Sequence, residues 1–468
     1  MEFPYGKAPF WILVMAIITG LAMMLSRTFT NAGRPDLVFV VFAPRHYEAY
    51  LKLIPEFERK HNVKVQLQQV HQRPLQTRLQ SALLADTDVP DMVEIMNPFM
   101  GAFMKGPLDD VGFVDLTDRV KAEKLDEKMV ESRFSIWSSR GRIFALPHDV
   151  HPVALAYRRD IVEHLGIDVN KIETWDDFVR IAHEKIVKDV DGDGIIDRYA
   201  LDLSISGTSF FPIILLQRGG RYFDSQGNLT MDTDITIDTI LWYIRQSRGK
   251  TRISFPAGEG QPFYKALSDG IILFNFVPDW RSKVFEIDAE DLKGKMALMP
   301  LPAWEKGGRR TSTWGGTGLA ITEKSKNKEL AWELAKFLYL NKKDFSDRFA
   351  MLNVIPPLKE AWDLPAFQVE DEYYSGQKIG QIYAELAPET PPDYVGAYYE
   401  MVDGKTREVL IDGGVYYEKY GDKGLREFVT EKLKQKAAYV RRVMNRNVFL
   451  REGEVEITDA NSSKENAG

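Results

Sequence analysis

The chain has 468 residues and a formal net charge of −7, with 44% hydrophobic and 28% charged residues. This composition is that of a globular protein, and the acidic balance excludes a general nucleic-acid binder, which needs a basic surface. The absence of cysteine excludes disulfides, cysteine–zinc sites, iron–sulfur clusters and lipid anchors attached through cysteine. A chain of this length accommodates two large lobes.

The N-terminal segment carries a membrane signal. Residues 8–26 form an uncharged run between Lys7 and Arg27, and a helix needs about 20 apolar residues to cross a bilayer. The run is long for a cleaved signal peptide, and no good small-residue cleavage site precedes Arg27. We expect residues 1–34 to be a signal anchor in the inner membrane, with a cleaved signal peptide as the alternative. No second run of this length follows, so the remainder is expected to be periplasmic or otherwise extracytoplasmic.

The first part of the body alternates between strand and helix patterns. A continuous apolar run at 37–42 is typical of a buried parallel strand, and 63–70 alternates as a strand does. Apolar residues at helical spacing occupy 47–58 and 74–85, and 92–96 is a short apolar strand pattern. Strand, helix, strand, helix and strand in this order predict βαβ units and a mostly parallel sheet.

A second block of alternating patterns begins near residue 141. Thr174 followed by Asp177 resembles a capping box and predicts a helix start, and Trp175 and Trp332 fall in helical patterns and are assigned to the core. The tail, 446–468, is polar and aperiodic and is expected to be disordered. The patterns predict strands over 141–149 and 153–159, and helices over 160–166, 175–187, 329–340 and 425–444.

Six stretches occur in the order seen in the extracellular solute-binding proteins of ABC-type sugar importers, the family that contains maltose- and glycerol-phosphate-binding proteins. WGGTGLAITEKSKNKELAWELAKFL, residues 314–338, is the strongest resemblance, and LLADTDVPDMVEI, residues 83–95, resembles the family's signature of small residues, Pro-Asp and a strand. The other four stretches are 49–70, 145–168, 173–178 and 269–280. Together the resemblance covers roughly residues 35–440.

The resemblance implies an α/β periplasmic-binding-protein-like fold of two discontinuous lobes, which close by hinge motion around a ligand in the cleft between them. We expect lobe 1 to comprise residues 35–148 and about 283–328, and lobe 2 residues 149–282 and about 329–445. Many members of that family are lipoproteins anchored through a cysteine, which this chain lacks. Either the protein is free in a periplasm or its N-terminal apolar segment is the tether.

Sugars present flat apolar faces and a rim of hydroxyls, so a sugar cleft needs aromatic platforms with polar side chains beside them. The resemblance places several loops with such residues at the cleft. The aromatic candidates have core packing as their alternative, and the polar candidates have ordinary loop hydrogen bonds. The expected ligand-binding residues are Arg45, His46, Asn97, His148, Asp149, Asp279, Trp280, Trp314, Gly315 and Gly316, with Tyr394, Tyr398 and Tyr399 as further candidates.

An acidic loop at 189–197 resembles a calcium-binding loop. Asp189, Asp191, Asp193 and Asp197 stand at positions 1, 3, 5 and 9, with glycine at position 6. Position 12, which carries a bidentate glutamate in complete loops, is Ala200. The loop therefore predicts a structural calcium site that lacks one ligand, with a simple Asp/Gly turn as the alternative.

The chain lacks the common sequence motifs of enzyme active sites. It contains no His-Glu-x-x-His, no Gly-x-Ser-x-Gly and no complete Gly-x-Gly-x-x-Gly sequence. We therefore predict a binding protein, not an enzyme, which captures a sugar or oligosaccharide and delivers it to the permease subunits of an ABC transporter without a required cofactor. A ligand-sensing module coupled to a membrane receptor is the first alternative, and a carbohydrate-active enzyme is the second.

Overall fold

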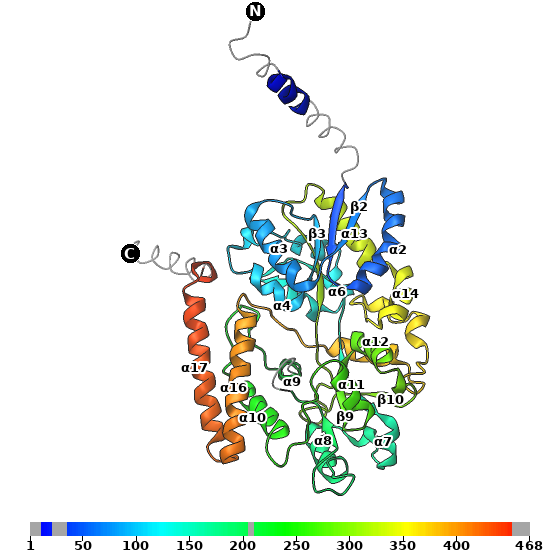
Figure 1. The fold of residues 1–468 in the computed structure, drawn as a ribbon, viewed down its shortest axis with the longest axis vertical. Coiled ribbons are helices and arrows are strands. Elements are labelled where there is room, and N and C mark those ends of the chain that lie inside the picture. Colours follow the sequence, from blue (N-terminus) through cyan, green and yellow to red (C-terminus); the bar gives the residue numbers. More distant parts are fainter. Residues whose placement is uncertain (1–10, 21–34, 205–209, 452–468) are drawn as a thin grey trace, which may run out of the picture.

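The computed structural model describes residues 11–20, 35–204 and 210–451, and it has two lobes, each built around its own sheet (Figure 1). Residues 11–20 are helical. Within the described ranges, no helix combines the length and apolar composition needed to cross a membrane. The predicted membrane segment, 8–26, extends beyond the described residues at both ends.

The first lobe contains a five-stranded sheet in the order β2 (Val65–Gln69), β1 (Leu37–Val41), β3 (Met92–Met96), β11 (Thr317–Ile321) and β6 (Leu146–Pro147). β1 pairs in parallel with β2 and β3, whereas β11 runs antiparallel to β3 and β6. The strands predicted at 37–42, 63–70 and 92–96 are therefore confirmed. The helices that accompany this sheet are α2 (Pro44–His61), α3 (Gln72–Ala85), α13 (Lys328–Tyr339) and α14 (Lys342–Leu352).

The second lobe contains a four-stranded sheet in the order β10 (Met296–Pro300), β7 (Val153–Arg158), β9 (Ile272–Pro278) and β8 (Tyr199–Leu201). β8 and β9 are parallel, and the other pairs are antiparallel. Its helices are α7 (Arg159–His164), α8 (Trp175–Ile181), α9 (Phe211–Gln217), α10 (Asp234–Ser247), α11 (Gln261–Ser268), α12 (Asp279–Asp288), α15 (Ile379–Leu386), α16 (Tyr399–Tyr420) and α17 (Leu425–Asn445). The last two lie side by side along one flank (Figure 1).

Short elements complete the described chain. The short helices α4 (Asn97–Met100), α5 (Thr117–Ala122) and α6 (Leu125–Lys128) belong to the first lobe, as does the hairpin of β4 (Ser138–Ser139) and β5 (Arg142–Ile143). The strand predicted over 141–149 is thus divided into β5 and β6. The predicted tail begins with a 3-10 helix, Val448–Arg451, and its remainder, 452–468, lies outside the described residues.

Two parts of the predicted lobe division differ from the structure. The predicted segment 283–328 was assigned to the first lobe, but β10 pairs with β7 in the second sheet. The segment 329–445 was assigned to the second lobe, but α13 and α14 pack on α2 in the first. β10 is a buried apolar run, and such a run gives no signal of which sheet it joins.

Local predictions from the sequence agree with the structure at several positions. Thr174 and Asp177 form the predicted capping box at the start of α8. Trp175 and Trp332 are buried, with 1% and 2% of their surface exposed, as core residues should be. α2 continues through Pro55, although a proline in mid-helix removes one backbone hydrogen bond.

Candidate functional site

Three chain segments connect the lobes and lie against one another. The first crossover, residues 148–152, joins β6 to β7, and the second, residues 311–316, leads from the second lobe into β11. The third, residues 353–358, leaves α14. The Val150 amide donates to the Ile355 carbonyl over 3.1 Å, and Pro152 forms a bridge with Thr313. Movement of one lobe relative to the other therefore bends all three segments together.

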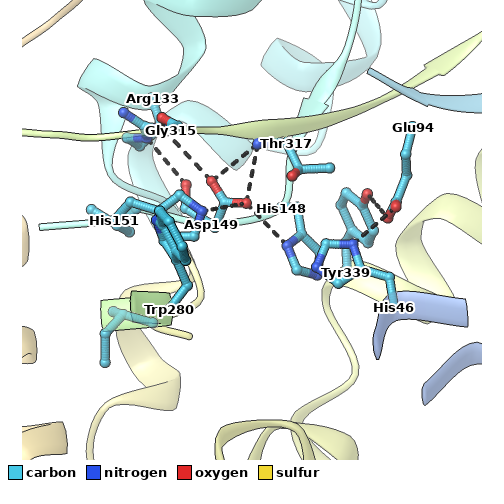
Figure 2. A network of polar contacts seen from close by, with 12 residues as sticks. His46, Glu94, Arg133, His148, Asp149, His151, Trp280, Gly315, Thr317 and Tyr339 are labelled. Carbon is cyan, nitrogen blue, oxygen red and sulfur yellow. Dashed lines mark hydrogen bonds and ion pairs between the residues drawn. The ribbon is translucent and has the colours of Figure 1, made fainter. Parts of the chain in front are cut away.

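Asp149 organises the first two crossovers from the interior. Its carboxylate accepts hydrogen bonds from the Thr317 amide at 3.2 and 3.1 Å, and its backbone carbonyl accepts from Nε of Arg133 at 3.1 Å (Figure 2). Arg133 also donates to Thr313 Oγ1 at 2.8 Å and to the Gly315 carbonyl at 3.1 Å. Burial alone would raise the pKa of Asp149, but His151 and His148 outweigh it and hold that pKa well below its usual value.

His151 joins Asp149 to the second lobe. Its Nε2 lies 3.1 Å from Asp149 Oδ2, and its Nδ1 lies 2.6 Å from Asp279 Oδ1. Burial lowers the pKa of His151, but the two carboxylates together overcome that effect and raise it to about 9. His151 is therefore an imidazolium held between two buried anions at neutral pH.

Asp279 stands where β9 meets α12, and both of its carboxylate oxygens have partners. Oδ1 accepts from the Trp280 amide at 2.7 Å, in addition to its contact with His151. Oδ2 accepts from the Ile355 amide in the third crossover, also at 2.7 Å. One carboxylate thus ties two crossovers to the second lobe.

A second buried polar group lies on the first-lobe side of Asp149. Glu94, in the middle of β3, accepts hydrogen bonds from the hydroxyls of Tyr50 at 2.6 Å and Tyr339 at 2.8 Å, and lies 2.9 Å from His46 Nδ1. The ring of His46 lies 4.3 Å from that of His148, centroid to centroid. Burial, with a contribution from His46, lowers the pKa of His148 to about 4, so that this ring is neutral at pH 7.

Four of the predicted polar site residues are buried in the structure and do not lie on the surface of a cleft. His46, His148, Asp149 and Asp279 are buried and hold partners from the protein, so they position the crossovers and have no surface to offer a sugar. These four were expected to bind ligand directly, and their burial corrects that expectation.

Arg45 and Asn97 have different surroundings from those four residues. Arg45 donates to the Met351 carbonyl near the end of α14, two residues before the third crossover begins. Asn97 stands at the start of α4, where its amide donates to the Gly316 carbonyl over 2.9 Å. Asn97 therefore contacts the second crossover directly, whereas Arg45 contacts the helix that leads into the third.

The two predicted tryptophans lie against each other where a crossover meets the second lobe. Trp280 and Trp314 are half-buried, and their rings lie 5.5 Å apart at 65°. Trp280 Nε1 donates to the Trp314 carbonyl at 3.1 Å, and the guanidinium of Arg281 lies 5.1 Å from the Trp314 ring. One indole comes from the second lobe and the other from a crossover, so their relative position depends on the lobe orientation.

The backbone after Trp314 needs glycine at two positions, 315 and 316. Gly315 has a φ of +98°, a conformation that residues with a Cβ rarely adopt. A Cβ on Gly316 would lie 2.7 Å from Nη2 of Arg133. These glycines allow Arg133 and Trp280 to pack against the crossover backbone.

A cavity of about 420 Å³ opens between the lobes, and neither Trp280 nor Trp314 is among the residues that line it. The first lobe contributes Met104 and residues 138–140, the second lobe contributes residues 223–229, and residues 394–397 run along it. The end of α17 completes its wall. Of the predicted tyrosines, Tyr394 lines this cavity, whereas Tyr399 packs on Tyr222 and Tyr398 contacts Asn447. The volume is within the range of about 300–1,000 Å³ found for small-ligand pockets.

Several residues of this region escaped the sequence analysis. Arg133 and Asp202 carry no motif, and Arg133 lies in a short 3-10 helix, Glu131–Trp137. Burial raises the pKa of Asp202, at the end of β8, to about 7 despite the opposing charge of Arg281. Glu94 did have a usable signal, because a carboxylate inside the apolar strand MVEIM must have buried partners.

The acidic loop brings three of its four carboxylates together. Ligand atoms of Asp189, Asp191 and Asp197 lie within 4.8 Å of one another, whereas Asp193 is not part of this group. Loop amides already donate to these oxygens, including the Gly192 amide to Asp189 Oδ1 at 2.6 Å. Ala200 is buried in β8, so position 12 supplies no oxygen from a side chain.

Comparisons with known proteins match most of the chain. The family model described as "Bacterial extracellular solute-binding protein" matches residues 43–344. The arabinooligosaccharide-binding protein of Halalkalibacterium halodurans is 27% identical over 385 residues, covering 79% of this chain and 82% of that protein. Its namesake in Bacillus subtilis is 25% identical over 411 residues, covering 86% and 92%. The sugar-binding protein MalE of Xanthomonas citri has a TM-score of 0.69 at 17% identity, covering 87% and 99%, which shows a shared two-lobed fold.

Proposed function

The chain belongs to the bacterial extracellular solute-binding protein family, and from this membership we propose that it captures an oligosaccharide between its lobes and delivers it to an ABC importer. The observation that carries the proposal is the interlobe cavity, which both lobes line and whose wall includes the aromatic rings of Phe223 and Tyr394. Aromatic faces stack on the apolar faces of sugar rings, while polar groups of the cavity meet hydroxyls. No step of covalent chemistry is needed for this role.

We propose arabino-oligosaccharides as the ligand class. Two relatives named for these ligands align with this chain over most of their length. The cavity is large enough for a few sugar rings and offers side chains of both characters, such as Tyr394, Phe223 and Asn228. A cavity with both polar and apolar walls suits a sugar, whose rings have apolar faces and a rim of hydroxyls.

Tyr394 lines the cavity, and the family resemblance places Trp280 and Trp314 at the cleft. Replacing any of the three with alanine is expected to weaken oligosaccharide binding by about 10- to 100-fold, since large aromatic anchors carry about 1–3 kcal/mol each in binding sites. Isothermal titration with arabino-oligosaccharides and with malto-oligosaccharides of equal length measures the effect and tests the ligand class. Tyr420→Ala, on the exposed side of α16, is the matched control and should bind normally. Unchanged affinity in all three variants would contradict the placement of the site.

The N-terminal run of residues 8–26 is proposed to tether the protein to the membrane outside the cytoplasm. The support is its uncharged length between Lys7 and Arg27 and the absence of cysteine for a lipid anchor. Membrane fractions washed with carbonate should retain the full chain, and a variant with two lysines in place of Ile17 and Ile18 should be released. N-terminal sequencing of the native protein identifies cleavage, and a mature chain that begins after residue 26 would contradict the tether.

Calcium is proposed to stabilise the acidic loop. Three converging carboxylates provide oxygen ligands, and water must supply the position that Ala200 leaves empty. The thermal midpoint should rise by a few degrees in millimolar calcium and return when a chelator is added, because a ligand that binds only the folded state stabilises it. Asp191→Asn should abolish this response. An identical midpoint in calcium and chelator would contradict the site.

A further inference from the structure

His46, Glu94 and His148 form a buried cluster with metal-ligating side chains. Their ligand atoms all lie within 4.8 Å of one another, and each residue is at most 9% exposed. The three come from different parts of the first lobe, namely α2, β3 and the start of the first crossover (Figure 2). None of the three is among the residues that line the interlobe cavity.

The hydrogen bonds around the cluster leave one lone pair without a partner. His148 Nδ1 lies 3.2 Å from Asp149 Oδ2, and since a carboxylate only accepts, Nδ1 carries the proton of this neutral ring. Nε2 of His148 is then a bare acceptor, and it is buried without a hydrogen-bond partner. An unpartnered buried polar atom costs free energy, which a bound cation would recover.

Two tyrosine hydroxyls fix the orientation of the Glu94 carboxylate. Its Oε1 accepts from the hydroxyls of both Tyr50 and Tyr339. Its Oε2 lies 2.9 Å from His46 Nδ1, and a metal ion bound by both groups would replace that contact. Metal-bound histidines and carboxylates commonly have outer partners of this kind, which fix their orientation. The contact of Asp149 with His148 Nδ1 is the same arrangement on the histidine side.

We propose that His46, Glu94 and His148 bind one transition-metal dication, with Zn²⁺ as the best fit. Two imidazoles and one carboxylate suit Zn²⁺, whereas Ca²⁺ and Mg²⁺ prefer sites made wholly of oxygen. Ligands at about 2 Å from one Zn²⁺ lie within about 4 Å of one another, so small side-chain shifts close the site. The carboxylates of Glu94 and Asp149 offset the charge of the ion. Its role is structural, because it fixes α2 and β3 to the point where the chain leaves the first lobe.

The test is a zinc titration of the untagged full-length chain after treatment with a chelator. In competition with a chromophoric chelator, the protein should bind one Zn²⁺ per chain with a submicromolar Kd. Co²⁺ in its place should give a visible absorption band of nitrogen and oxygen ligation. His46→Gln and His148→Gln should each weaken Zn²⁺ binding by more than about 100-fold, because loss of an outer partner alone costs about 10- to 100-fold. Asp149→Asn should have that smaller effect.

Two variants separate this site from other zinc ligands. His164→Gln removes an exposed histidine and should leave binding unchanged, and Asp191→Asn removes a ligand of the acidic loop and should do the same. Failure of the wild-type chain to bind one equivalent, or equal affinity in wild type and His148→Gln, overturns the proposal. The cobalt spectrum of the wild-type chain decides the ligand type even where a histidine variant does not fold, and an all-oxygen spectrum also overturns it.

Discussion

Replacing Asp279 with asparagine is expected to lower the free energy of unfolding by about 3–5 kcal/mol, the usual cost of breaking a buried ion pair by removing one partner. Asp279 Oδ1 lies 2.6 Å from His151 Nδ1, and Oδ2 accepts from the Ile355 amide at 2.7 Å. An asparagine has a single oxygen, so its NH₂ group must face one of these two donors. The variant therefore loses a charge and gains a donor–donor clash in the same place.

Urea unfolding followed by tryptophan fluorescence and by circular dichroism measures this loss. Asp363→Asn removes an exposed aspartate and is expected to change stability by less than about 0.5 kcal/mol, as surface substitutions usually do. Both substitutions remove one negative charge, so their difference reports the buried contacts of Asp279. A loss below 1 kcal/mol in Asp279→Asn would show that the carboxylate does not hold the crossovers together.

The sequence predicts the elements of this fold better than it predicts their assignment to lobes. The strand at 37–42 and the helix start at Thr174 depend on local patterns, and both are present in the structure. The lobe of β10 depends on pairing with β7, about 140 residues earlier in the chain, and no local pattern records it. Discontinuous lobes therefore limit sequence reasoning even where individual strands are predicted correctly.

The candidate site shows the same limit for side chains. Trp280 and Trp314 could be named because the family resemblance places their loops at the cleft, and they are half-buried beside each other. His148 and Asp279 could be named as polar residues near the crossovers, but their burial follows from contacts with His46 and Ile355 across the fold. Residue type identified these positions as polar or aromatic groups that could bind a ligand. Only tertiary packing decides whether their side chains face a ligand or the protein interior.

His151 is expected to make folding stability depend on pH between about 6.5 and 9. Burial lowers the pKa of His151, but the charges of Asp149 and Asp279 outweigh burial and raise that pKa from 6.5 to about 9 in the folded state. A base with a raised folded pKa binds more protons when folded, so it contributes stability fully below pH 6.5. That contribution falls as the pH rises and is lost above about 9. A shift of this size corresponds to about 3 kcal/mol.

His151→Gln isolates this contribution, because glutamine fills similar space without a titrating proton. The difference in unfolding free energy between wild type and His151→Gln should be largest at pH 6 and should shrink by about 3 kcal/mol by pH 9.5. Taking the difference cancels other groups that titrate nearby in pH, such as Asp202, whose pKa burial raises to about 7. Urea midpoints measured every half pH unit test the prediction. A difference that is independent of pH would mean that His151 is neutral between its two carboxylates, and the crossovers would then be joined by ordinary hydrogen bonds.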